Sequence, residues 1–113
     1  MNVLFVCARN RWRSPTAASV FRGDPRMTVR SAGLSPSSPR RLTARDLAWA
    51  DLVLVMEPEH RRRIVRVFRD ECDLPPIRSL DIPDDFAFMD VELVDLLRAS
   101  TEAALSDHLD EQA

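Results

Sequence analysis

Four short apolar runs along the chain are typical of strands, and residues with helical spacing follow each of them. The runs at residues 3–6 and 52–56 are continuously apolar, as expected of strands buried on both faces, whereas residues 27–31 alternate. Residues 77–80 follow two prolines and form the fourth run. Strands that alternate with helices predict an α/β fold, here a four-stranded parallel sheet with helices on both faces.

Helix signals lie between these runs and after the last one. Ser14 and Pro15 fit an N-cap followed by proline at the first helical position, and Thr43 with Asp46 resembles a capping box. The predicted helices begin near four positions: Pro15, Thr43, Pro58 and Val91. In the last helix we expect fraying in the acidic tail after about residue 106.

Composition limits the function classes. A chain of 113 residues with 45% hydrophobic residues favours one compact domain, residues 1–113. The net charge of −2 does not suggest a nucleic-acid partner, and no segment suits a membrane span. Cys7 and Cys72 lie too far apart for a compact zinc site, and two free thiols suit a reducing compartment. We therefore expect a cytoplasmic protein without a metal ion or cofactor.

The stretch CARNRWRS, residues 7–14, carries the candidate chemistry. If it loops between strand and helix, backbone N–H groups and the helix N-terminus form an anion site that favours a thiolate at Cys7. Arg13 is placed to grip two phosphoryl oxygens in a fork, and the Ser14 hydroxyl to donate to the thiolate. The predicted substrate-binding residues are those of the loop: Ala8, Arg9, Asn10, Arg11, Trp12, Arg13 and Ser14.

Simpler interpretations accompany this one. Cys7 also fits a buried structural thiol at a strand end, and Cys72 is interpreted as inert. Arg9 and Arg11 fit solvated loop charges as well as a rim that attracts anions, and Trp12 is a candidate for the pocket wall.

The segment VLFVCARNRWRSPTAASVF resembles the signature of low-molecular-weight protein tyrosine phosphatases, in which five residues separate cysteine from Arg-Ser-Pro. The likeness continues through Ser31-Ala32-Gly33, ADLVLVME at residues 50–57 and the aspartate-bearing loop after the fourth strand, and it is greatest to a short bacterial subgroup. The resemblance implies the same α/β fold, with Cys7 as nucleophile, Arg13 as phosphate clamp and Ser14 as thiolate stabiliser. It also implies that Asn10 holds the loop in shape.

The resemblance further implies an aspartic acid after the last strand that protonates the leaving oxygen. The segment DIPDD at residues 81–85 offers three carboxylates. We favour Asp81, because it follows the strand directly and parallel α/β sheets bind ligands at the carboxyl ends of their strands. Asp84 is the alternative acid and Asp85 ranks third.

The leading hypothesis is a cysteine-dependent phosphatase that hydrolyses phosphomonoesters through a phosphocysteine intermediate. Its partners are a phosphorylated protein or a small phosphate ester, and inorganic phosphate or a similar oxyanion. One alternative is a phosphate- or phosphoprotein-binding module with weak or no turnover. The other is an arsenate reductase-like enzyme, which ranks lowest because such a relay uses additional cysteines and Cys72 alone is present.

Overall fold

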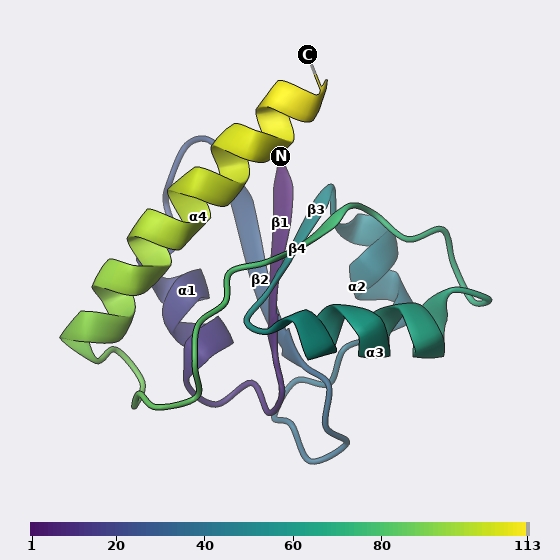
Figure 1. The fold of residues 1–113 in the computed structure, drawn as a ribbon. Coiled ribbons are helices and arrows are strands. Elements are labelled where there is room, and N and C mark those ends of the chain that lie inside the picture. Colours follow the sequence, from purple (N-terminus) through teal and green to yellow (C-terminus); the bar gives the residue numbers. More distant parts are fainter. Residues whose placement is uncertain (113) are drawn as a thin grey trace.

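A four-stranded parallel sheet forms the centre of the protein, whose computed structural model describes residues 1–112 (Figure 1). The strand order is β2-β1-β3-β4, so β1 is an inner strand and β2 and β4 are the edges. The bounds are β1 (Asn2–Cys7), β2 (Thr28–Gly33), β3 (Leu52–Val55) and β4 (Ile77–Ser79). This arrangement confirms the predicted fold class.

Four helices cover the sheet, two on each face (Figure 1). The helices α1 (Arg13–Phe21) and α4 (Val91–Gln112) pack on one face, and α2 (Ala44–Trp49) and α3 (Pro58–Phe68) pack on the other. Successive side chains of β1 point to opposite faces, because side chains alternate along a strand. Phe5 stacks on Phe21 of α1 with 5.9 Å between ring centroids, whereas Leu4 joins the core cluster under α2 and α3.

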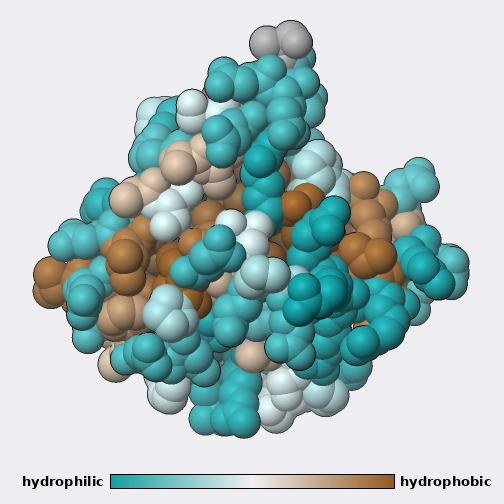
Figure 2. Space-filling model, viewed as in Figure 1, coloured by the Kyte–Doolittle hydropathy of each residue, from teal (hydrophilic) through white to brown (hydrophobic). Residues whose placement is uncertain are grey.

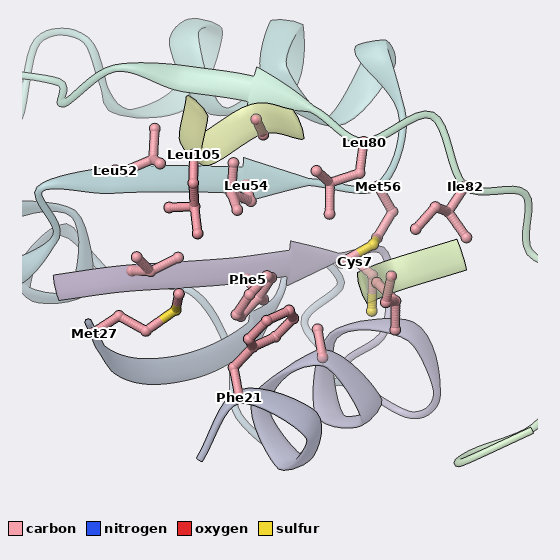
Figure 3. Close-up of a cluster of buried hydrophobic side chains, with 14 of the residues drawn as sticks. Phe5, Cys7, Phe21, Met27, Leu52, Leu54, Met56, Leu80, Ile82 and Leu105 are labelled. Atoms are coloured by element: carbon pink, nitrogen blue, oxygen red, sulfur yellow. The ribbon is translucent and has the colours of Figure 1, made fainter. Parts of the chain in front are cut away.

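The register brings the carboxyl ends of the strands to one edge. Cys7 at the end of β1 pairs with Gly33 at the end of β2, and Val55 pairs with Ser79 at the ends of β3 and β4. Figure 3 shows Cys7 at the end of β1, with Met56 and Ile82 beside it. The loops that follow the strands therefore meet around Cys7.

Helix boundaries agree with the sequence except at the start of the first helix and the end of the last one. The capping box of Thr43 and Asp46 is present, with the Thr43 hydroxyl accepting from the Asp46 backbone N–H. Ser14 is not an N-cap: α1 begins at Arg13, and the Ser14 hydroxyl faces Cys7 instead. The last helix continues as regular helix through Gln112, past the point where fraying was expected.

The surface is mostly hydrophilic on the face drawn in Figure 2, with apolar side chains gathered where α4 begins. The exposed apolar residues of that segment are Phe88, Met89 and Val91. Among residues 1–112, no helix combines the length and the apolar character that crossing a membrane requires.

Candidate active site

The loop between β1 and α1 folds back over the Cys7 sulfur. Asn10 has a left-handed backbone with φ of 54°, a conformation that asparagine adopts more readily than most residues. The turn points the Asn10 backbone N–H at Cys7 Sγ, at 3.2 Å. The buried Asn10 side chain donates to Ser14 Oγ at 2.9 Å and so ties the middle of the loop to the first turn of α1.

Two hydrogen-bond donors converge on the sulfur. Ser14 Oγ lies 3.0 Å from Cys7 Sγ. Because the Asn10 amide already donates to Ser14 Oγ, the hydroxyl proton is free to point at the sulfur or at the Ala32 carbonyl, 3.4 Å away. The first geometry, together with the Asn10 N–H, stabilises a negatively charged sulfur.

The segment after β2 supports the loop from behind. The backbone N–H of Leu34 donates to the Cys7 carbonyl at 3.1 Å, and that of Ser35 donates to the Ala8 carbonyl at 2.7 Å. These bonds hold both carbonyl oxygens on the side away from the site. Gly33 permits the close packing, because a Cβ there would lie 2.9 Å from the Arg9 backbone carbon.

Arg13 is buried and anchored from two other strand ends. Its Nη1 donates to Glu57 Oε2 at 2.8 Å and to the Ile82 carbonyl at 2.7 Å. Asp84 Oδ1 lies 3.6 Å from Nε. Among residues 1–112, no hydrogen bond engages Nε or Nη2. One edge of the guanidinium is thus fixed by hydrogen bonds, and the other edge faces only the longer contact with Asp84.

His60 completes the support of Arg13 through Glu57. Its Nδ1 accepts from the Glu57 backbone N–H at 3.2 Å, and its Nε2 lies 3.5 Å from Glu57 Oε2. Burial, with a further contribution from the Arg13 charge, lowers the pKa of His60. Neither Glu57 nor His60 was predicted from the sequence as part of the site. A carboxylate directly after the third strand was the signal for Glu57, whereas His60 had none.

A small hollow opens above the loop. Its lining residues are Cys7, Ala8, Arg9, Arg11, Trp12, Arg13 and Asp84. Of the predicted substrate-binding residues, Asn10 and Ser14 are not in this lining; they lie buried behind it and hold Cys7 and the loop.

The structure places Asp84, and not Asp81, at the hollow. The pairing of β3 and β4 continues beyond Ser79, because the Ile82 backbone N–H donates to the Met56 carbonyl at 2.8 Å. Asp81 therefore belongs to the sheet edge, with a φ of 56° and its carboxylate accepting from Ser79 Oγ at 2.6 Å. Asp84, three residues beyond the aspartate favoured from the sequence, lines the hollow together with Cys7. Which aspartate acts as the acid stays a prediction. Asp85 is exposed and does not line the hollow.

Cys72 is separated from this site by the sheet. Cys7 belongs to the core cluster under α1 and α4, whereas Cys72 packs on the cluster under α2 and α3. Both cysteines are free. Burial raises the pKa of Cys72, as do the neighbouring carboxylates of Glu71 and Asp73. Among residues 1–112, no three His, Cys, Asp or Glu side chains are grouped to hold a metal ion.

The fold is that of solved low-molecular-weight protein tyrosine phosphatases, which the sequence resemblance predicted. A low-molecular-weight protein tyrosine phosphatase from T. tengcongensis is 25% identical with a TM-score of 0.68, over 100% of this chain and 99% of that one. The YwlE arginine phosphatase from Geobacillus stearothermophilus is 27% identical with a TM-score of 0.63, over 98% and 91%.

A third solved structure shares the fold at lower identity. The tyrosine phosphatase Wzb from Escherichia coli K30, in complex with phosphate, is 20% identical with a TM-score of 0.73, over 94% of this chain and 96% of that one. No family model matches the sequence, and no curated protein matches it.

Proposed function

We propose that the protein hydrolyses phosphomonoesters through a phosphocysteine intermediate on Cys7. The observation that carries this proposal is the convergence of three groups on one hollow: the Cys7 sulfur, the Arg13 guanidinium and the Asp84 carboxyl. They come from the end of β1, the start of α1 and the segment after β4, so the fold itself assembles them.

The first step transfers the phosphoryl group to sulfur. Backbone N–H groups of the loop and the Nε and Nη2 edge of Arg13 bind the phosphoryl oxygens, a fork geometry suited to two oxygens at once. Cys7 Sγ attacks phosphorus in line with the leaving oxygen, so an S–P bond forms while the P–O bond breaks. Asp84 donates a proton to the leaving oxygen, which departs as an alcohol or phenol.

The second step releases phosphate. The Asp84 carboxylate takes a proton from a water molecule that attacks phosphorus, and the S–P bond breaks. Sulfur leaves as a thiolate, which the Ser14 hydroxyl and the Asn10 N–H stabilise. Asp84 is thereby protonated again and inorganic phosphate is free to leave.

Asp84 takes the acid role in this proposal in place of Asp81. It lines the hollow beside Arg13, whereas the Asp81 carboxylate is bonded to Ser79. A phosphoryl group on the Nε and Nη2 edge of Arg13 displaces the Asp84 carboxyl, which lies 3.6 Å from Nε, and the displaced carboxyl faces the ester oxygen from the wall of the hollow.

Neither alternative function is favoured. A module that only binds phosphate needs the loop and Arg13, but it does not need the carboxyl of Asp84 in the same hollow as the Cys7 sulfur. An arsenate reductase relay needs a second thiol near Cys7, and Cys72 lies on the other face of the sheet. The proposed substrates are phosphorylated proteins or small phosphate esters, consistent with the tyrosine and arginine phosphatases that share the fold. The free thiols favour action in a reducing compartment, the cytoplasm.

The test compares wild type, Cys7→Ser and Cys72→Ser on p-nitrophenyl phosphate, with acid quenching to trap the phosphoenzyme. We expect hydrolysis in wild type and Cys72→Ser, loss to the background rate in Cys7→Ser, and, in the quenched wild type, a phosphoryl adduct that peptide mapping assigns to residue 7. Wild-type protein that binds vanadate without hydrolysing the ester would identify the binding module instead.

A further inference from the structure

The rim of the hollow carries two positive charges that no neighbouring carboxylate neutralises. Arg9 and Arg11 are exposed and line the hollow, and among residues 1–112 no carboxylate oxygen lies within 4.0 Å of either guanidinium. Arg13 differs, because Glu57 and Asp84 both face it. The phosphoryl-binding charge is therefore balanced, and the unbalanced charge lies where the rest of the substrate must pass.

We propose that Arg9, Arg11 and Trp12 select an aryl phosphate flanked by acidic groups, that is, phosphotyrosine within an acidic segment of a protein. This inference rests on the proposed function and names its substrate class.

The local backbone explains why these three side chains face the substrate. Around the left-handed turn at Asn10, the side chains that build the site are buried, whereas Arg9, Arg11 and Trp12 are exposed. The same turn that points backbone N–H groups toward the sulfur therefore leaves the side chains of Arg9, Arg11 and Trp12 exposed at the edge of the hollow. Guanidinium groups on long stems bind carboxylates in a planar fork, so two of them on one rim favour carboxylates beside the phosphate.

Trp12 supplies the aromatic part of the selection. Its side chain is 46% exposed although it lines the hollow, so a large part of the side chain is accessible to a ligand there. Stacked or edge-to-face contact between aromatic rings adds to the contact area that they bury. Phosphoarginine fits less well, because its guanidino group would sit beside the like charges of Arg9 and Arg11.

The experiment uses three phosphotyrosyl peptides of the same length, whose flanking positions are all Glu, all Gln or all Lys. We expect kcat/KM in the order Glu, Gln, Lys, with about 1.4- to fivefold between neighbours per contacting charge, the range of an exposed ion pair. The kcat/KM values of the three peptides should become nearly equal in 0.5 M salt, because the Debye length falls there to a few ångströms. A phosphoarginine peptide with Gln flanks should be a poorer substrate than its phosphotyrosine counterpart.

Variants assign the effect to the rim. Arg9→Gln and Arg11→Gln should each lower the Glu-to-Gln ratio of kcat/KM, and the double variant should bring it close to one. Arg22→Gln is the matched control, because Arg22 is also exposed but follows the far end of α1. It should keep the wild-type ratio. Trp12→Ala should weaken the binding of phosphotyrosyl peptides more than the binding of inorganic phosphate.

Binding separates this inference from the proposed function. The affinity of the Cys7→Ser variant for the same three peptides tests the selection even if wild type hydrolyses nothing. Equal affinities and equal kcat/KM values for the three peptides in low salt would overturn the inference. So would a Glu preference that survives in the Arg9→Gln, Arg11→Gln double variant, or a phosphoarginine peptide as the better substrate.

Discussion

Replacement of Asp84 by asparagine isolates the proposed acid, because the amide keeps the shape of the side chain and loses the transferable proton. Asp84 is 57% exposed, so water screens its 3.6 Å contact with Nε of the buried Arg13, and we expect this contact to contribute about 0.2–1 kcal/mol, the range of exposed pairs. The Asp84→Asn protein should therefore unfold in urea within about 1 kcal/mol of wild type. General acid catalysis contributes about 10²–10⁴-fold, so we expect kcat with phenyl phosphate to fall within that range.

The leaving group provides the decisive measurement. A nitrophenolate leaves without much assistance, so Asp84→Asn should slow p-nitrophenyl phosphate less than phenyl phosphate. A series of substituted phenyl phosphates should give a steeper dependence of log kcat on leaving-group basicity in the variant than in wild type. Asp81→Asn is the matched control, because the Asp81 carboxylate accepts a hydrogen bond from Ser79 and does not line the hollow. The reasoning is refuted if Asp84→Asn slows all esters equally, or if Asp81→Asn alone steepens the dependence.

Three further predictions test other parts of the structure. Iodoacetamide at neutral pH should label Cys7 and spare Cys72, whose pKa is raised by burial and adjacent carboxylates, and phosphate should protect Cys7; peptide mapping that finds equal labelling would contradict this. Gly33→Ala should destabilise by about 1–3 kcal/mol in urea unfolding and lower kcat/KM, because its Cβ would meet Ser38 and the phosphate-binding loop, and Ser38→Gly should restore only part of the loss. His60 has a lowered pKa in the folded state, so the unfolded chain binds more protons as pH falls below about 6.5 and stability should decline, by at most about 1.4 kcal/mol per pH unit from this group; His60→Asn should flatten that slope, and an unchanged slope would show that other groups set it.

Local sequence patterns were sufficient for the sheet and for the core of the site. The continuous burial of β1, the capping box at Thr43 and the six-residue spacing from Cys7 to Arg13 all depend on residues close together in the chain. The fold class could therefore be predicted, as could the loop that surrounds the Cys7 sulfur.

Long-range contacts could not be predicted in the same way. Arg13 binds Glu57 and the Ile82 carbonyl across 44 and 69 residues, and no periodicity in the sequence indicates such pairs. The preference for Asp81 assumed that the last strand ends where its apolar run ends. Ile82 continues the pairing with Met56, and this shifts the carboxylate that reaches the hollow to Asp84.

The alternation of buried and exposed side chains around the Asn10 turn also separates what evolution can change from what it must keep. Cys7, Asn10 and Ser14 are locked together inside the protein, and a substitution at any of them disturbs the other two. Arg9 and Arg11 are fixed only by their backbone, so their side chains are open to replacement with little effect on the shape of the loop. Related proteins can therefore acquire new substrates through substitutions at exposed positions such as 9 and 11, while the proposed reaction stays the same.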